Sequence, residues 1–326
     1  MKWAREKARL LEAGAVRLTG APVDRYIERS SAGPSAGGAG SVFFTAGGRR
    51  VRLGINPGSP IVLKHTGSGH ARILMDDDVL EGELEPVGLH CPRQAYITVS
   101  AGCIFRCRYC PVPLQPERVK SPEEIERMIE GVIDRIDAIS ITSGVVGSVA
   151  EDEDRVCTIL ERIARFEKPV GVSIYPREGT PARLKALGVV EVKFNLETAT
   201  AALFEEMCPG LDRNAIRTAL RESVAIFGRN RVFTNVILGL GESDAEIEDC
   251  IRECAAEGVI PVIRPLNPVA GCSGYVRPSA ERLLAVCRLH DTILREAGLD
   301  PRLAITMCTA CTGCDLVPGR DCDGER

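Results

Sequence analysis

Two patterns of hydrophobic and polar residues divide the chain. Up to residue 90, hydrophobic positions follow a helical period at 2–14 and then fall into short β-like runs broken by Gly and Pro. These runs are 42–45, 51–53, 61–63 and 72–75. From residue 95 onwards, hydrophobic strand-like runs alternate with amphipathic stretches of helical period. The pattern predicts a helix and a small β-rich part, followed by an α/β domain.

The α/β part contains six strand-like runs, at 95–100, 138–142, 170–174, 191–196, 232–238 and 259–263. Ser121 and Ser243 each precede a Glu by three residues, which is typical of a capping box at the start of a helix. Alternating strands and helices predict parallel strands joined by crossover helices. Six such units fit a partial (β/α)6 barrel better than a complete eight-stranded one, which takes about 250 residues. The active site is expected at the carboxyl ends of the strands.

We therefore expect three parts. Residues 1–90 form an N-terminal helix with a small β-rich extension, residues 91–300 form the partial barrel, and residues 301–326 form a Cys-rich tail. A stretch rich in Gly, Ser and Ala at 31–41 is typical of a linker, and the acidic run 76–78 is typical of a solvated turn.

Composition narrows the function classes. The 326 residues are 44% hydrophobic, which excludes general disorder. The balance of 41 basic and 45 acidic residues, with 4% aromatic residues, argues against a nucleic-acid partner. No apolar run approaches the ~20 residues of a membrane span, so a cytoplasmic protein is expected. Fourteen cysteines in such a chain indicate metal or redox chemistry rather than disulfides.

Three of these cysteines, Cys103, Cys107 and Cys110, directly follow the first predicted barrel strand with C-x3-C-x2-C spacing. Three thiolates can bind three irons of a [4Fe–4S] cluster and leave the fourth iron open to another ligand. A zinc knuckle and a chance group of core cysteines are the alternatives. The position of all three in one loop at the catalytic end of a strand favours the cluster.

This loop resembles the C-x3-C-x-aromatic-C signature of the radical S-adenosylmethionine (SAM) superfamily, with Tyr109 as the aromatic residue. The resemblance covers about residues 93–300. It implies a partial barrel whose cluster binds SAM and reduces it to methionine and a 5′-deoxyadenosyl radical, which abstracts a hydrogen atom from substrate. It also implies a reducing partner such as ferredoxin or flavodoxin.

Three further segments lie at strand ends where the superfamily places its SAM contacts. The segment after the second strand corresponds to the glycine-rich contact to the methionine amino group, and the one after the fourth to the polar contact to ribose and carboxylate. The segment after the fifth is similar to the G-L-G-E turn near adenine in biotin and lipoate synthases. With Tyr109 of the cysteine loop, the residues implied as cofactor contacts are Thr142, Ser143, Gly144, Asn195, Glu197, Gly239 and Gly241.

A second group of cysteines lies in the tail, where Cys308, Cys311, Cys314 and Cys322 have C-x2-C-x2-C-x7-C spacing. This density is more typical of a second, auxiliary [4Fe–4S] cluster than of a structural zinc site, and a tail of free thiols is the third alternative. Of the other cysteines, Cys157, Cys250, Cys254 and Cys287 are expected to be buried in the core, and Cys91 and Cys208 are unassigned. Cys272, in a loop after the sixth strand, is expected to be structural, with a position facing the active site as the alternative.

Charged residues near the strand ends leave alternatives open. Arg264 ends the sixth strand and either pairs with an anion at the catalytic face or extends into solvent. Glu191 and Lys193 alternate along the fourth strand and would both point into the barrel as a polar pair, unless Glu191 only begins the strand.

An auxiliary cluster near a radical source is typical of sulfur insertion. The chain resembles the biotin-synthase-related proteins of archaea, including the two-protein lipoate synthases, which would bring a second radical SAM protein as partner. It lacks the N-terminal C-x4-C-x5-C motif and the C-terminal Arg-Ser-Ser-Tyr segment of bacterial lipoate synthases. The leading hypothesis is a lipoyl synthase-like sulfurtransferase acting on an octanoylated carrier protein. The alternatives are methylation or cross-linking of a peptide or protein, with the auxiliary cluster as electron relay or substrate anchor, and a non-catalytic iron–sulfur carrier.

Overall fold

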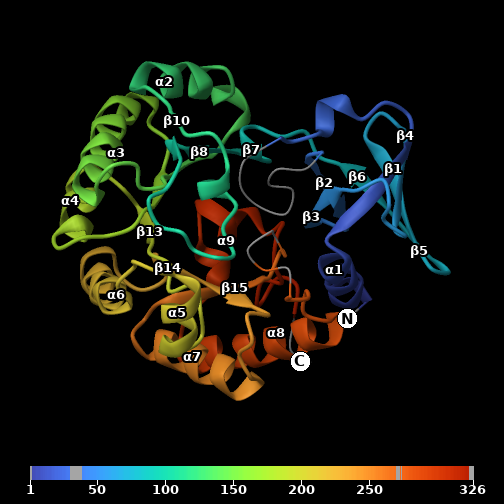
Figure 1. Ribbon diagram of the computed structural model, residues 1–326. Coiled ribbons are helices and arrows are strands. Elements are labelled where there is room, and N and C mark those ends of the chain that lie inside the picture. The colour runs from blue at the N-terminus through green and yellow to red at the C-terminus, as the bar shows by residue number, and fades with distance from the viewer. Residues whose placement is uncertain (1, 30–38, 269–271, 273, 323–326) are drawn as a thin grey trace.

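The computed structural model describes residues 2–29, 39–268, 272 and 274–322. Most of the expected linker at 31–41 lies outside these residues. The chain forms two lobes, a small β-rich lobe at the N-terminus and a larger α/β lobe (Figure 1). The Cys-rich segment near the C-terminus lies within the α/β lobe.

The N-terminal lobe is a helix followed by a closed six-stranded barrel. The expected helix is α1 (Lys2–Ala13). The barrel order is β1-β3-β2-β6-β5-β4, in which β1 pairs in parallel with β3 and β4 and the other pairs are antiparallel. The strands are β1 (Ala15–Gly20), β2 (Ser41–Ala46), β3 (Arg49–Ile55), β4 (Val62–Gly67), β5 (His70–Met75) and β6 (Asp78–Leu84). Four strands match the predicted runs. β1 and β6, whose side chains are mostly polar or exposed, close the sheet and remove its free edges.

The larger lobe is a half-barrel of six parallel strands, as predicted. Its strand order is β15-β14-β13-β12-β11-β8, and a short antiparallel strand, β7 (His90–Cys91), extends it beside β8. The strands are β8 (Gln94–Thr98), β11 (Ala138–Thr142), β12 (Val170–Ser173), β13 (Glu191–Lys193), β14 (Val232–Leu238) and β15 (Ile260–Pro265). A two-stranded pair, β9 (Ser100–Ala101) and β10 (Arg118–Val119), flanks the loop after β8.

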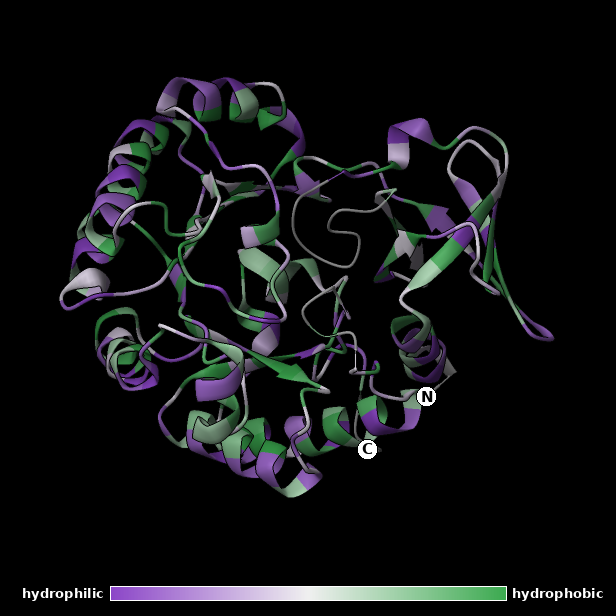
Figure 2. Cartoon of the chain, in the orientation of Figure 1, coloured by the Kyte–Doolittle hydropathy of each residue, from purple (hydrophilic) through white to green (hydrophobic). Residues whose placement is uncertain are grey.

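In the described part of the chain seven helices accompany the half-barrel strands, and several present hydrophilic residues outwards (Figure 2). They are α2 (Pro122–Glu130), α3 (Val149–Ile163), α4 (Thr180–Ala186), α5 (Ala201–Met207), α6 (Arg213–Phe227), α7 (Asp244–Ala256) and α8 (Ala280–Glu296). Ser243 forms the predicted capping box at the start of α7. At α2 only one half of the predicted box is formed, in which the Ser121 hydroxyl accepts from the Glu124 amide. Short 3-10 turns are η1 (Asp24–Tyr26), η2 (Val112–Leu114), η3 (Ile133–Arg135), η4 (Ala164–Phe166) and η6 (Pro301–Leu303).

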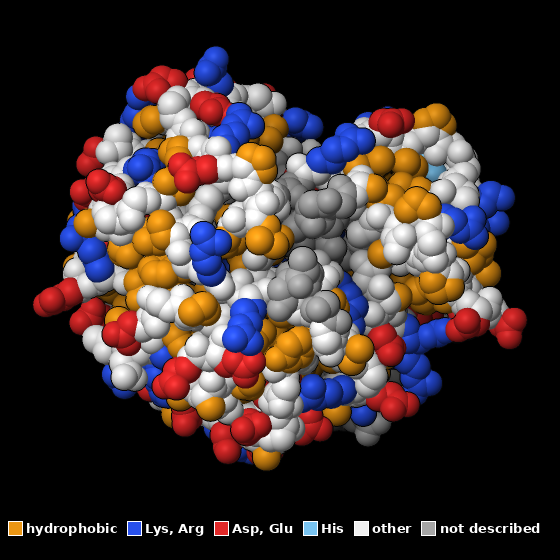
Figure 3. All heavy atoms as spheres, in the orientation of Figure 1, with side chains coloured by type: hydrophobic (Ala, Val, Ile, Leu, Met, Phe, Trp, Pro, Cys, Tyr) orange, Lys and Arg blue, Asp and Glu red, His pale blue; other side chains and the backbone are white. Residues whose placement is uncertain are grey.

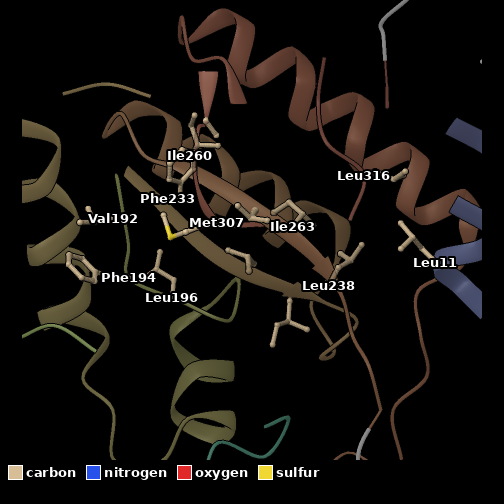
Figure 4. Close-up of a cluster of buried hydrophobic side chains, with 14 of the residues drawn as sticks. Leu11, Val192, Phe194, Leu196, Phe233, Leu238, Ile260, Ile263, Met307 and Leu316 are labelled. Carbon is tan, nitrogen blue, oxygen red and sulfur yellow. The ribbon is translucent and has the colours of Figure 1, made fainter. Parts of the chain in front are cut away.

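The Cys-rich segment differs from the expected appended tail, because it enters the half-barrel. Its helix α9 (Met307–Cys311) begins with a fully buried Met307, which joins the hydrophobic core that includes Val192 and Phe233 (Figure 4). Gly171 on β12 makes room for this segment, since a Cβ atom there would lie 2.1 Å from Thr306 Oγ1. We call residues 304–322 the plug.

No helix in the described part of the chain is both long and apolar enough to cross a membrane. Basic and acidic side chains are interspersed over the face shown in Figure 3.

Candidate active site

One cavity of about 420 Å³ lies inside the half-barrel and is closed on one side by the N-terminal lobe. Phe43 and Arg52 of the small barrel contribute to its lining. Both cysteine triplets that the sequence singled out line this same cavity: Cys103, Cys107 and Cys110 from the loop after β8, and Cys308, Cys311 and Cys314 from the plug. Two motifs some 200 residues apart in the sequence therefore share one internal space.

The first triplet lies in a loop that is fixed against the end of β11. The Ile104 amide donates to the Val145 carbonyl at 2.8 Å, and the Cys110 amide donates to the Cys107 carbonyl at 3.0 Å. Gly144 allows this close approach, because a Cβ atom there would lie 2.1 Å from the Gly102 carbonyl oxygen. The loop thus presents three half-buried thiols to the cavity, and its backbone is held in place by these hydrogen bonds and by the close packing at Gly144.

The donor chemistry of this loop fits an iron–sulfur cluster. Among the described residues, no three His, Cys, Asp or Glu side chains are gathered as ligands of a single metal ion. A four-iron cluster binds each thiolate through a different iron, so its ligands are spread more widely than those of one ion. Three thiols spaced around one loop match that requirement.

Cys208, which the sequence left unassigned, lies beside this loop. Its Sγ is 3.8 Å from Tyr109 Oη, and it hydrogen-bonds to Cys107. This hydrogen bond lowers the pKa of Cys107, and it raises that of Cys208 together with burial. Of the two thiols, Cys107, the residue of the predicted ligand set, therefore loses its proton more readily.

The predicted SAM segment after β11 lines the cavity. Ser143 Oγ donates to Asp152 Oδ1 at 2.8 Å, and Ser100 Oγ reaches the same oxygen at 3.1 Å. Burial raises the pKa of Asp152, while these hydroxyls and Arg155 oppose the shift. Ser143 is thus held by the protein, and Thr142 and Gly144 complete this part of the lining.

The predicted segment after β13 also lines the cavity. Asn195 Oδ1 accepts from the Asn235 amide at 3.3 Å. Glu197 adopts a left-handed backbone, with φ 62°, and is tied to β14 by hydrogen bonds to the Asn235 carbonyl and the Ile237 amide, both 2.8 Å. Burial raises the pKa of Glu197 to about 7, although Lys193 opposes the shift. A carboxyl group that is half-protonated near pH 7 can either accept or donate a hydrogen bond to a ligand.

The G-L-G-E turn after β14 does not contribute to the described cavity lining, unlike the other two segments. Glu242 closes its own turn, since its carboxylate accepts from the Gly239 amide at 2.8 Å and the Leu240 amide at 2.9 Å. It also pairs with Arg282 at 3.1 Å. Gly239 and Gly241 both have φ 111°, which glycine adopts readily, and their contact with SAM stays a prediction.

The plug cysteines lie among positive charges. Lys193 Nζ is 3.5 Å from Cys308 Sγ, and Tyr96 Oη is 4.0 Å from the same sulfur. Burial raises the pKa of Cys308, but Lys193 and Arg264 outweigh it and the net shift is downwards. Arg264 therefore faces the cavity and the plug rather than solvent, which resolves the two alternatives left by the sequence.

Glu191 anchors the plug, a role that the sequence did not indicate. Its buried carboxylate accepts from the Thr306 amide at 2.9 Å, the Thr306 hydroxyl at 2.6 Å and the Ile305 amide at 3.0 Å. Arg231 pairs with it at 2.7 Å. Glu191 and Lys193 both point into the barrel, as predicted. Each contacts the plug, and they do not pair with each other in the way that the sequence suggested.

Cys322 does not join the other plug cysteines. It forms a disulfide with Cys287 of α8, so its sulfur is not available as a thiolate ligand, and the predicted fourth position of the motif is corrected. The cysteine that contacts Cys311 is Cys91, which lies in β7. The remaining cysteines expected in the core, Cys157, Cys250, Cys254 and Cys287, are all buried, as is Cys272.

Comparison with known proteins supports the assignment made from this geometry. Residues 97–254 match the family described as Radical SAM superfamily. This part of the chain is a radical SAM domain. The superfamily implies an enzyme that uses a [4Fe–4S] cluster and SAM, and the matched residues contain the first cysteine triplet. No curated protein matches the chain by sequence.

Several solved structures resemble the fold. The FeFe-hydrogenase maturase HydG from Carboxydothermus hydrogenoformans is 16% identical with a TM-score of 0.54, over 63% of this chain and 52% of that chain. Methylornithine synthase (PylB) is 15% identical with a TM-score of 0.52, over 71% and 73%. SuiB of Streptococcus suis, bound to S-adenosylmethionine, is 15% identical with a TM-score of 0.52, over 64% and 48%. The chain spans about half the length of HydG and SuiB, and likeness at this identity shows the fold alone.

Proposed function

We propose that this radical SAM protein is a sulfurtransferase that inserts sulfur into an unactivated C–H bond. The proposed substrate is an octanoyl chain on a carrier protein, and ferredoxin or flavodoxin would supply electrons. The observation that carries the proposal is that both cysteine triplets line one cavity of about 420 Å³. When bound there, two [4Fe–4S] clusters would supply the electron for SAM cleavage and the sulfur atom for the product.

The chain's own residues have distinct roles in this proposal. Cys103, Cys107 and Cys110 would hold the radical cluster, and the plug cysteines would hold the second one. Thr142, Ser143 and Gly144 would contact the methionine amino group of SAM, and Asn195 and Glu197 would offer polar contacts to it. The lining also includes Phe105, Ile174, Leu211, Ile237 and Leu266, which suit an alkyl chain and exclude water from a reactive radical.

The fixed position of the plug supports sulfur insertion over a distant electron relay. An alkyl radical can bond to sulfur only if the sulfur already lies within reach, which requires positioning in advance. The plug would provide this positioning, because hydrogen bonds to Glu191 and to the small barrel hold it in place at the cavity. If two proteins together thiolate the octanoyl chain, a second radical SAM protein would carry out the second thiolation.

The test uses clusters rebuilt with heavy-isotope sulfide and an octanoyl-lysyl peptide as substrate. We expect heavy sulfur in the product, formed together with 5′-deoxyadenosine. A variant with Cys308, Cys311 and Cys314 changed to Ala should lose the sulfur product but keep SAM cleavage, whereas changing Cys103, Cys107 and Cys110 to Ala should abolish SAM cleavage. A parent protein that methylates or cross-links a peptide without incorporating sulfur would refute sulfur insertion and favour peptide modification.

A further inference from the structure

We propose that Cys91 is the fourth thiolate ligand of the second cluster, together with Cys308, Cys311 and Cys314. This inference rests on the second cluster of the proposed function. All four residues line the cavity, and Cys91 forms a buried group with Cys311 and Phe43. Four thiols from two distant segments thus converge at one place, where a [4Fe–4S] cluster with complete cysteine ligation would be held.

The local fold gives Cys91 a fixed position. It lies in β7, where it pairs with Gln94 of β8. The Gln94 side chain donates to the Met307 carbonyl at 3.1 Å and accepts from Ser140 Oγ at 3.0 Å. Since Gln94 is hydrogen-bonded to the first residue of α9 and paired with Cys91, the hairpin and the plug are held in register. Cys91 is 1% exposed, so its thiol faces protein and cavity.

The two rival ligands are less suitable. Cys322 is disulfide-bonded to Cys287. His90 also lines the cavity, but its Nε2 lies 3.1 Å from Arg52 Nη1. Because arginine can only donate, His90 Nε2 is the acceptor in this contact, and its lone pair is not available to iron.

Arg52 provides an independent indication of an anionic ligand. The side chain is 1% exposed, and its Nη2 has no hydrogen-bond partner among the described residues. Its other nitrogens contact Ser41 Oγ at 2.8 Å and His90, and its backbone amide donates to the Gly313 carbonyl at 2.7 Å. A buried guanidinium with an unused donor is costly unless an anion completes its shell, and a cluster with four thiolates carries net negative charge.

The charges around the four cysteines agree with this assignment. Lys193 reaches Cys308, and Arg50 Nη1 donates to the Cys311 carbonyl at 2.8 Å while it pairs with Glu85. Asp315 is the opposing charge nearby, and Arg264 and Lys7 face it. On binding iron, each cysteine thiol would lose its proton to solvent, so the positive groups would balance the thiolates that form.

The experiment isolates the second cluster by using the full chain with Cys103, Cys107 and Cys110 changed to Ala. This background should retain about 4 iron and about 4 sulfide per chain. Adding Cys91→Ala should reduce iron to about 3 or fewer and produce the electron paramagnetic resonance signal of a three-iron cluster. The matched control, Cys322→Ala, also removes one cysteine and should keep about 4 iron with an unchanged spectrum.

A second variant distinguishes the loss of a ligand from a loss of folding in Cys91→Ala. Cys91→Ser replaces the thiol by a hydroxyl of similar size that can bind iron through oxygen. We therefore expect retained iron with a changed Mössbauer spectrum at one iron, while circular dichroism matches the background. Unchanged iron content and spectra in both Cys91 variants would overturn the assignment and leave the second cluster in place. A background without iron would instead refute the second cluster and the proposed function with it.

Discussion

Removing the Glu191 carboxylate should release the plug from the half-barrel. Glu191→Ala leaves the amide and hydroxyl of Thr306 buried without their acceptor. Each unsatisfied buried donor costs about 1–3 kcal/mol. The Ile305 amide belongs to an exposed residue, and Arg231 is 34% exposed, so both contribute little. The two donors together predict a loss of about 2–6 kcal/mol in the free energy of opening the plug.

Hydrogen exchange of the amides at 304–312 measures this local opening directly. The expected loss corresponds to exchange that is faster by roughly 10- to 10⁴-fold, since about 1.4 kcal/mol is a factor of ten. Glu191→Gln keeps one acceptor oxygen and should show a smaller acceleration. Glu178→Ala, which changes an exposed glutamate on the same lobe, should exchange like the parent. Exchange in Glu191→Ala within threefold of the parent would contradict the anchoring role.

Three further outcomes are expected. Gly171→Ala should destabilise the protein by about 1–3 kcal/mol in urea unfolding, because the new Cβ meets Thr306 Oγ1. The control Gly274→Ala places its Cβ in open space and should leave the stability unchanged. Equal effects of the two substitutions would contradict the tight packing of the plug. Burial lowers the pKa of His290 to about 3, below its unfolded value of about 6.5, so the unfolded chain gains a proton that the folded protein does not. Stability should fall as pH drops from about 6.5 towards 3, by up to about 1.4 kcal/mol per pH unit, and His290→Gln should remove this contribution in urea titrations at several pH values. Lys193→Met removes a positive charge beside the plug cysteines, and this charge would favour reduction of the second cluster because reduction adds negative charge there. The variant should therefore lower the midpoint potential of the cluster. A redox titration that gives an unchanged or higher potential would refute the electrostatic role of Lys193.

Several features of the protein follow from its sequence alone. The six half-barrel strands, their order and the cysteine loop after the first strand were all predictable, because hydrophobic period and ligand spacing are local properties. The plug cysteines were also recognisable as a group by their spacing. Thr142, Asn195 and Glu197 could be placed at the cavity because parallel strands bring their carboxyl ends to one side.

Only the tertiary structure decided which distant segments meet. Cys91 and Cys311 are more than 200 residues apart, and no local pattern relates them, while Cys322 has ligand-like spacing but bonds to Cys287. Closure of the small barrel likewise depends on β1 pairing with β4 across the intervening chain. The sequence contains the side chains for these contacts, but their partners are set by the packing of the whole chain, in which buried polar groups must find donors, acceptors or opposite charges.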